Sequence, residues 1–402
     1  MDHTTAAAPP PGGHELPVNA IRVLVAPDKF KGSLTASQVA ASLAAGLRQE
    51  NPGLEVRTLP LADGGDGSVE AARGAGFQSL TVPVTGPTGH RTTTTVAFDG
   101  TTAVVEVATT ASLQMLPPGR PAPLTSSSVG VGQAVRAVLD RRPARIVLAL
   151  GGSATTDGGA GMLSALGVVF RDALGHPFVP TGGTLREIAD VDLTGLVGLD
   201  GVELVAANDV QNPLLGPDGA AAVYGPQKGA GPEDVELLEA GLGCVVRRLE
   251  EAGRPAAEAA GAPGAGAAGG LGWAAMLLGA RTVSGADFFL DLLGFDRQVA
   301  GCDLVITGEG KLDTQTLSGK LPLAVARRAA PVPVVAVVGH NALPTDRLTD
   351  HGIDRVWALS AMTEADSAAD PGLSAALLRE IGRRIAGSPE LTSSGTASAS
   401  GR

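Results

Sequence analysis

The chain of 402 residues has few aromatic residues, few cysteines and few lysines. Aromatic residues make up 3% of the chain against 44% for all hydrophobic residues, so its core has to be built mainly from Ala, Val and Leu. The two cysteines, Cys244 and Cys302, form no CxxC pair, which disfavours a disulfide framework and a structural zinc site. No apolar run approaches the roughly 18 residues that span a bilayer, and the N-terminus lacks a basic start followed by an apolar stretch. We therefore expect a cytoplasmic protein with no membrane partner.

The charge of the chain also limits what it can bind. The formal net charge is −11 and no basic stripe is present, so we expect no nucleic-acid partner. The six histidines form no HxxxH or HExxH pattern, and no GxSxG motif occurs. These absences disfavour a metal-dependent hydrolase and a serine hydrolase of the GxSxG type.

Apolar runs that alternate with helical patterns at both ends of the chain predict a parallel α/β architecture. Strands are predicted at 21–26, 54–59, 303–307, 332–338 and 355–359, and helices at 36–50 and 318–330. Thr35 followed by Gln38 is a capping-box pattern that predicts the start of the first helix. The length exceeds what one core usually organises, and the pattern changes between about 86 and 295, which predicts an inserted second domain. Residues 1–19 and 387–402 are small and polar, which predicts disordered tails.

Glycine is abundant, at 56 residues, and much of it lies beside polar or charged residues in five segments. These segments are 26–33, 61–70, 151–162, 208–231 and 307–322. All five lysines of the chain lie in them and no arginine does, although Lys and Arg together number 30. A lysine ammonium binds phosphate or carboxylate as a point charge, so we expect at least two of these lysines to contact a bound anion.

The segment 151–162, GGSATTDGGAGM, follows a strand predicted at 145–150 and precedes a helical pattern. Such a turn directs backbone N–H groups and a helix N-terminus at one point, which favours an anion there. The alternative is a tight turn whose glycines are needed for positive φ. The segment is not a Walker A loop, and GAGAAG at 264–269 has the spacing of a dinucleotide motif but follows no predicted strand, so we interpret that match as chance.

Seven carboxylates lie in these segments beside Gly or Lys. They are Asp28, Asp63, Asp66, Asp157, Asp209, Glu309 and Asp313. Phosphoryl transfer uses such groups, because one or two carboxylates hold Mg²⁺ and another can accept the proton of the attacking hydroxyl. Any of them can instead be an N-cap or part of an Asx turn, and this alternative stays open above all for Asp28 and Asp66.

With these motifs the chain resembles the bacterial glycerate kinase family from about residue 21 to residue 386. The family's order and spacing are matched by APDKFKGSLTA, LPLADGGDGSVEA, GGSATTDGGAGMLSALG, DVQNPLLGPDGAAAVYGPQKGA, GAGAAGGLG and DLVITGEGKLDTQTLSGKLP. The resemblance implies a Rossmann-like α/β domain built from residues 20–85 and 296–386, an inserted α/β domain at 86–295, and an active-site cleft between them. It also implies transfer of the γ-phosphate of ATP to D-glycerate, giving 2-phosphoglycerate and ADP.

The chain departs from the family in two places. It has TSSSVGVG at 125–132 where the family commonly has a TSYGTG-like stretch, and GHN at 339–341 where the family has an AGS-like turn. The first departure affects an expected substrate contact. The second affects a loop expected near the nucleotide.

The motifs and the resemblance together predict roles for individual residues. Catalytic roles are expected for Asp313, as acceptor of the hydroxyl proton, and for Lys31, Lys320 and Asp157. ATP is expected at Gly151, Gly152, Ser153, Thr155, Gly158, Gly159, Lys228, Glu309 and Lys311. Glycerate is expected at Asp28, Lys29, Lys31, Asp63 and Asp66, and Mg²⁺ at Asp209 and Asp63, with Asp157 as an alternative ligand.

Other functions stay open at this point. The same family chemistry could phosphorylate the 3-hydroxyl of glycerate or another small hydroxy-acid. A non-catalytic anion-binding module could use the same Gly-rich loops, but seven loop carboxylates would repel an anion unless a metal were bound. The sequence also leaves open whether the chain forms a homodimer.

Overall fold

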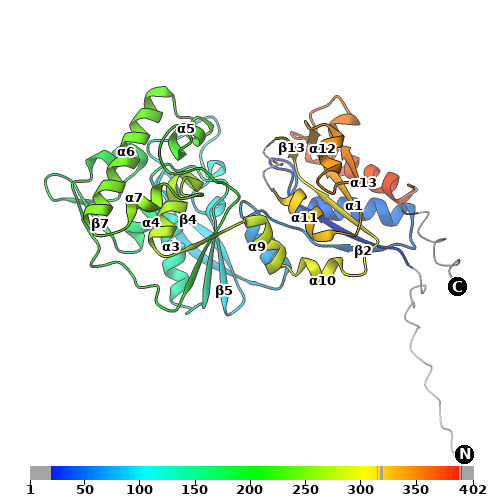
Figure 1. Ribbon diagram of the computed structural model, residues 1–402, viewed down its shortest axis with the longest axis horizontal. Helices are drawn as coiled ribbons and strands as arrows, with labels where there is room; N and C mark the ends of the chain where they lie inside the picture. The colour runs from blue at the N-terminus through cyan, green and yellow to red at the C-terminus, as the bar shows by residue number, and fades with distance from the viewer. Residues whose placement is uncertain (1–19, 315, 317–319, 389–390, 392–402) are drawn as a thin grey trace, which may run out of the picture.

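The protein folds into two α/β domains, which lie side by side in Figure 1. The computed structural model describes residues 20–314, 316, 320–388 and 391. One domain combines the blue N-terminal segment with the orange and red C-terminal segments, and the other contains the cyan and green middle of the chain. The predicted insertion of one α/β domain into another is therefore confirmed.

The discontinuous domain has a five-stranded sheet in which all strands are parallel. Its order is β16 (Arg355–Ala358), β14 (Val334–Val338), β12 (Leu304–Gly308), β1 (Arg22–Pro27) and β2 (Glu55–Thr58). The chain leaves β1 towards β2 on one side and leaves β12 towards β14 and β16 on the other. The strand order therefore reverses between β1 and β12, and such switch points are where open parallel sheets bind ligands.

Helices cover both faces of this sheet. They are α1 (Ala36–Glu50) and α13 (Pro371–Ala386) on one face and α11 (Leu321–Ala329) on the other. Val23 and Val25 of β1 belong to the core cluster of α1 and α13, whereas Leu24 and Ala26 belong to that of α11. Side chains alternate between the faces of a strand, so burial on both faces explains the continuous apolar run of β1.

The inserted domain has a six-stranded mixed sheet. Its order is β11 (Arg281–Val283), β10 (Glu203–Ala207), β6 (Arg145–Ala149), β5 (Thr102–Glu106), β4 (Arg91–Phe98) and β3 (Gln78–Thr85). The first four strands are parallel, and β4 and β3 are antiparallel to their neighbours. Helices α3 (Val129–Leu139), α4 (Ala160–Ala165), α6 (Pro232–Glu251) and α8 (Leu271–Leu277) share one core with this sheet. The carboxyl ends of β6 and β10 place the Gly151 and Asp209 segments at one edge.

The remaining elements are short or connect the domains. Helices α2 (Ser68–Gly74) and α9 (Gly285–Leu292) belong to a core cluster that also takes residues from both large sheets. Smaller helices are α5 (Ala220–Tyr224), α7 (Ala256–Ala260), α10 (Phe295–Val299) and α12 (Thr345–Thr349). Two small sheets contain β8 (Pro177–Phe178), β7 (Val169–Arg171) and β9 (Asp190–Asp192), and β13 (Lys311–Leu312) with β15 (His340–Asn341). No helix among the described residues is long and apolar enough to cross a membrane.

The predictions for single helices and caps agree with the structure more closely than the predicted limits of the domains and tails. The helix predicted at 36–50 and its capping box between Thr35 and Gln38 are confirmed. The segment 264–269 follows the helix α7 and not a strand, as expected for a chance motif. The helix predicted from 318 begins at Leu321 among the described residues.

The positions of two elements favour domain boundaries other than the predicted ones. Strand β3 pairs with β4 over Gln78–Thr85, so the six-stranded sheet begins before the predicted boundary at 86, because the antiparallel hairpin needs both strands. At the other end, Leu391 is 2% exposed and packs in the core cluster of α1 and α13, so the predicted tail cannot begin at 387. We propose domain boundaries close to Phe77 and Ser284. The predicted tail at 1–19 lies outside the described residues.

Candidate active site

Two cavities meet between the domains. The larger one, about 890 Å³, lies beyond the carboxyl ends of β1, β12, β14 and β16 and is lined by the loops that follow these strands. The smaller one, about 250 Å³, lies beyond the carboxyl ends of β6 and β10. Lys31, Asp63 and Lys320 line both. Two cations and one carboxylate therefore stand where the cavities join.

Glycines let the loops at this junction approach each other closely. The N–H of Gly151 donates to the carbonyl of Gly64 at 3.2 Å, and a Cβ on Gly151 would lie 2.5 Å from the Cα of Gly65. A Cβ on Gly285 would lie 2.0 Å from the carbonyl oxygen of Asp63. Gly64 also has φ of +83°, which disfavours any other residue there. These glycines are explained by loop packing, which fixes Asp63 at the edge of both cavities.

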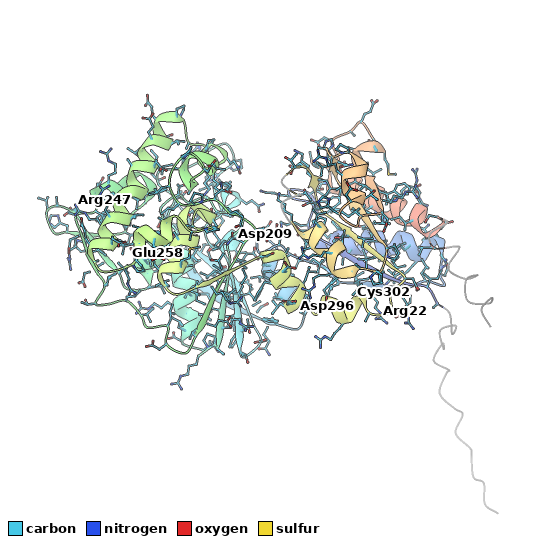
Figure 2. The ribbon with its side chains drawn as sticks, in the orientation of Figure 1. Arg22, Asp209, Arg247, Glu258, Asp296 and Cys302 are labelled. Atoms are coloured by element: carbon cyan, nitrogen blue, oxygen red, sulfur yellow. The ribbon has the colours of Figure 1, made fainter. Side chains whose placement is uncertain are left out.

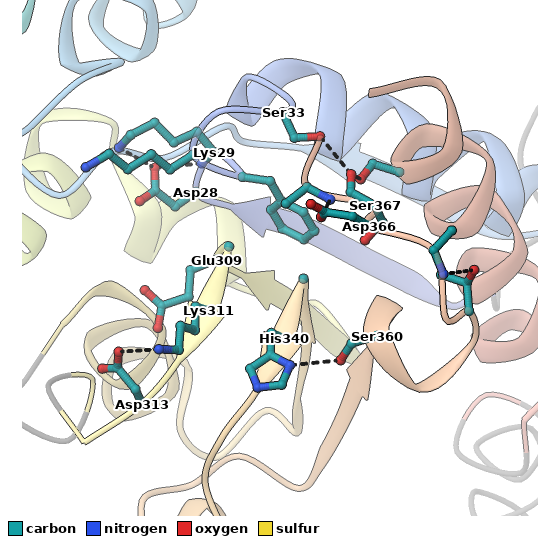
Figure 3. A pocket seen from close by; sticks show the side chains of 18 of the residues that line it. Asp28, Lys29, Ser33, Glu309, Lys311, Asp313, His340, Ser360, Asp366 and Ser367 are labelled. Atoms are coloured by element: carbon teal, nitrogen blue, oxygen red, sulfur yellow. Dashed lines mark hydrogen bonds and ion pairs between the residues drawn. The ribbon is translucent and has the colours of Figure 1, made fainter. Parts of the chain in front are cut away.

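Lys29 lies among carboxylates. Its Nζ is 3.5 Å from Oδ1 of Asp28 (Figure 3). It is also 3.7 Å from Oδ1 of Asp63, and the Lys29 side chain is 15% exposed. Burial by itself lowers the pKa of Lys29, but Asp63, Asp28, Asp66 and Glu106 together raise this pKa above its usual range. Burial raises the pKa of Asp28, against the opposing effect of Lys29. The positive charge of Lys29 is thus already balanced within the protein.

Glu106 belongs to this cluster although no sequence motif pointed to it. It ends β5, is 2% exposed, and accepts hydrogen bonds from the N–H groups of Gly67 at 3.2 Å and Val69 at 2.8 Å. Burial raises its pKa to about 7, although both backbone bonds lower it. The signal that could have found it is a charged residue at the end of the otherwise apolar strand TAVVE. Glu106 ties the sheet of the inserted domain to the loop that carries Asp63 and Asp66.

The surroundings of Lys228 are neutral, in contrast to the carboxylates around Lys29. It is 5% exposed, lines the smaller cavity, and its Nζ donates to Oγ of Ser153 at 3.0 Å and to the carbonyl of Thr155 at 2.6 Å. Burial lowers the pKa of Lys228 to about 7, with Asp157 opposing this shift from a distance. Among the residues that the structure describes, no carboxylate forms an ion pair with it.

Asp209 and Asn208 follow β10 and also line the smaller cavity. Oδ1 of Asp209 accepts from Oγ of Ser284 at 2.9 Å and from the N–H of Gly285 at 3.0 Å, whereas its Oδ2 is buried without a hydrogen-bond partner in the described part of the chain. Burial raises the pKa of Asp209 to about 6, and nearby Asp63 adds to this rise. Figure 2 shows Asp209 on the side of the inserted domain that faces the other domain.

The loop after β12 carries several polar side chains that line the larger cavity (Figure 3). Nζ of Lys311 is 3.6 Å from Oδ2 of Asp313, and the hydroxyl of Thr316 donates to Oε1 of Glu309 at 2.8 Å. Burial raises the pKa of Glu309 to about 7, although Thr316 and Lys320 lower it. His340, from the departure GHN, lines the same cavity and contacts Oγ of Ser360 through Nδ1 at 3.2 Å.

Several predicted site residues lie away from both cavities. Asp157 is fully buried, and its carboxylate accepts from the N–H and Oγ of Ser128 and from the N–H groups of Gly159 and Gly161. It therefore joins the starts of α3 and α4, and we propose that Asp157 has this structural role instead of the predicted catalytic or metal-binding role. The departure TSSSVGVG contains this Ser128, so it serves the same internal contact and does not line the cleft.

Other predicted site residues also lie outside the two cavities. Gly158 and Gly159 have positive φ, and a Cβ on Gly159 would lie 2.4 Å from Cβ of Ala274. Thr155 contributes its carbonyl to Lys228 and lines neither cavity. Asp66 lines a third cavity of about 270 Å³, which Lys29 and Lys31 also line. Only Gly151, Gly152 and Ser153 of the segment 151–162 reach the cleft.

Known proteins are similar to this chain along nearly its whole length. A protein-family model described as the glycerate kinase family matches residues 23–387. A glycerate kinase of Bacillus subtilis strain 168 is 39% identical over 357 residues, which cover 84% of this chain and 90% of that protein. A glycerate 2-kinase of Escherichia coli strain K12 is 36% identical over 349 residues, which cover 84% and 90%. The crystal structure of a Salmonella typhimurium LT2 protein assigned as glycerate kinase 2 matches with a TM-score of 0.76 at 38% identity, covering 92% of this chain and 98% of that one.

Proposed function

This chain belongs to the glycerate kinase family, and from that premise we propose that it transfers the γ-phosphate of ATP to the 2-hydroxyl of D-glycerate. The observation that carries the proposal is the pair of unequal cavities that share Lys31, Asp63 and Lys320. Phosphoryl transfer requires a donor and an acceptor on either side of one point, and catalysis then consists mainly of positioning and charge stabilisation.

We place ATP in the larger cavity and the acid in the smaller one. A cavity of about 890 Å³ at the switch point between β1 and β12 accommodates a nucleotide, whereas one of about 250 Å³ suits a three-carbon acid. This allocation differs from the sequence-based expectation, in which Gly151, Gly152, Ser153 and Lys228 bound ATP. Those residues line the smaller cavity, and they are proposed to bind the acid instead.

Lys31 and Lys320 are proposed to hold the phosphoryl group during transfer. Both face the point where the cavities meet, and charge builds up on the transferred group and its bridging oxygen. Lys320 is also the N-cap residue of α11, so its backbone position is tied to the start of that helix. Lys29, which carboxylates surround, is proposed to organise the Asp63 loop and not to bind substrate.

Asp63 at the junction and Asp209 in the smaller cavity also fit a divalent cation. Mg²⁺ in kinases is commonly bound by one or two carboxylates together with phosphate oxygens and water. Oδ2 of Asp209 is a buried acceptor without a partner among the described residues, and Asp63 raises the pKa of Asp209 from nearby. We propose that these two carboxylates would hold Mg²⁺, which supplies neutralising charge to the phosphates.

Asp313 is less well placed for the predicted role of proton acceptor. It lines only the larger cavity and its carboxylate lies beside Lys311, so an acid in the smaller cavity would have Asp63 and Asp209 nearer its hydroxyl. The transition state of phosphoryl transfer is loose and gains little from a strong base. We propose that Asp313 instead helps to orient the loop after β12.

The product of the reaction tests the proposal directly. The purified protein is mixed with MgATP and D-glycerate and coupled to enolase, with and without phosphoglycerate mutase. Enolase consumes only 2-phosphoglycerate, so we expect signal without mutase. Signal that requires mutase would place the phosphate on the 3-hydroxyl, and ADP without either signal would indicate another product. If no hydroxy-acid stimulated ADP release, the kinase assignment to this chain would fail.

A further inference from the structure

We propose that the smaller cavity recognises the carboxylate of the acceptor through Lys228 and Asn208, and that these two side chains make the enzyme selective for short hydroxy-acids over neutral polyols. The inference rests on the proposed function, because it concerns the acceptor of the same reaction. It adds the chemical group that is recognised and the two residues that recognise it.

Lys228 has one donor left for a ligand. An ammonium has three N–H groups, and the described partners of Lys228 are Oγ of Ser153 and the carbonyl of Thr155. Both partners are neutral, so they satisfy hydrogen bonds without balancing the charge. Burial also lowers the pKa of this lysine to about 7, and an anion bound beside it would favour its charged form again.

Asn208 supplies a second unsatisfied donor. It is 6% exposed and lines the smaller cavity, and its Oδ1 accepts from the N–H of Val210 at 3.0 Å. This bond orients the amide, and its Nδ2 is buried without a hydrogen-bond partner in the described part of the chain. Buried polar groups are almost always paired in folded proteins, so an orphaned donor in a cavity wall points to a ligand acceptor.

The charged side chains around the smaller cavity favour one orientation of the bound acid. The carboxylates of the cavity, Asp63 and Asp209, are the proposed metal ligands, and Asp63 stands at the junction with the larger cavity. Asp157, the carboxylate that acts on Lys228, is occupied by four hydrogen bonds within the inserted domain. An acid can therefore place its carboxylate at Lys228 and Asn208 and its hydroxyl towards the junction.

A pair of substrates that have nearly the same shape but differ in charge tests this inference. D-Glyceramide replaces the carboxylate of D-glycerate with an amide of nearly the same shape, and Lys228→Met removes the ammonium with little change in volume. We expect Lys228→Met to lower kcat/KM for D-glycerate about 10²-fold and that for D-glyceramide less than about 3-fold, as for loss of one charge-assisted hydrogen bond. Equal losses for both compounds, or no loss for either, would overturn the inference.

Two further variants keep the test decisive. Asn208→Asp retains the oxygen that accepts from Val210 but replaces the Nδ2 donor with a negative oxygen, so it should also weaken glycerate more than glyceramide. Lys311→Met removes a lysine that lines only the larger cavity, and it should change the glycerate-to-glyceramide ratio less than about 2-fold. A ratio changed as strongly by Lys311→Met as by Lys228→Met would contradict the assignment to the smaller cavity.

Calorimetric titration separates this inference from the proposed reaction. D-Glycerate should bind the wild-type protein more tightly than D-glyceramide, and Lys228→Met should abolish the difference, whether or not ADP is formed. Selective binding without ADP release would refute the proposed reaction and support the carboxylate site. ADP release with glycerate, together with binding that Lys228→Met leaves unchanged, would support the reaction and refute the site.

Discussion

Lys29 and Lys228 are both largely buried at the cleft, but the protein surrounds them in opposite ways. Lys29 lies within 3.7 Å of Asp63 and 3.5 Å of Asp28, and carboxylates raise its pKa. Lys228 contacts a hydroxyl and a carbonyl, and burial lowers its pKa to about 7. We therefore propose two functions for the same residue type: one lysine balances the charge of a loop, and the other depends on an anionic ligand for its counter-charge.

The difference shows that a lysine in a Gly-rich loop is not by itself an anion site. Lys29 follows the strand β1 and faces a cavity, as an anion-binding lysine would, but its neighbouring carboxylates leave little net positive charge. Lys228 also lies in a Gly-rich segment, 208–231, at the end of a short 3₁₀ turn, Pro226–Lys228. Its function depends on what surrounds it, and those surroundings come from distant parts of the chain.

The largest expected effect concerns the two lysines that line both cavities. Lys31→Ala and Lys320→Ala should each lower kcat by about 10²- to 10³-fold, because each removes a charge that the account places on the transferred phosphoryl group. An assay of ADP release at saturating ATP and acid measures this. Wild-type turnover in both variants would mean that these lysines, like Lys29, serve only the protein.

The same substitution at the two compared lysines should affect stability very differently. Lys29→Met leaves Asp28 and Asp63 without a counter-charge and should lower the free energy of unfolding by about 3 kcal/mol. Lys228→Met removes a buried charge together with two hydrogen bonds, and these effects offset each other to within about 1 kcal/mol. Urea unfolding measures both values, and equal losses would contradict the comparison.

The carboxylates around Lys29 predict a pH dependence that Lys228 does not share. The pKa of Glu106 rises from 4.5 to about 7, so the folded protein retains a proton that the unfolded chain loses between these values. The stability that this protonated carboxyl contributes is present at low pH and is lost as the pH rises through about 7. Glu106→Gln removes this loss, so its stability relative to wild type should improve by about 2 kcal/mol between roughly pH 5 and pH 8. A stability difference independent of pH would show that Glu106 is ionised throughout.

The smallest expected effect is at Asp313. If the acid lies in the smaller cavity, Asp313→Asn should lower kcat less than about 5-fold, because the residue does not touch the acceptor hydroxyl. Steady-state kinetics with varied D-glycerate measures this. A loss of more than about 10²-fold in kcat with unchanged KM values would restore Asp313 as the proton acceptor.

Local patterns in the sequence predicted more of this structure than long-range contacts could. The strand at β1, the helix at 36–50 and the capping box at Thr35 depend on neighbouring residues, and the structure contains all three. The cleft segments were also predictable, because loops after parallel strands gather at one edge. By contrast, the structural role of Asp157 could not be predicted from local sequence, because its bonds to Ser128 join segments 29 residues apart.

The roles within the site depend on contacts that no local pattern records. Glu106 reaches Val69 across 37 residues, and Lys228 reaches Ser153 across 75. Gly151 belongs to the turn that was predicted to bind an anion, but its close approach to Gly64 and Gly65 explains much of its presence. The sequence pattern predicts which segments come together at the cleft. The charge state of each side chain depends on the partners that surround it in the folded protein.

The charge states of the two lysines can be measured directly, because the chain has only five lysines. Lysine labelled with ¹³C at Cε gives five signals, which Lys→Met variants assign. We predict that Lys228 titrates near pH 7 in the free protein and that D-glycerate moves this titration to higher pH, whereas Lys29 stays charged up to at least about pH 10. A Lys228 that stays charged across this range, or one whose titration D-glycerate does not shift, would contradict the difference between the two lysines.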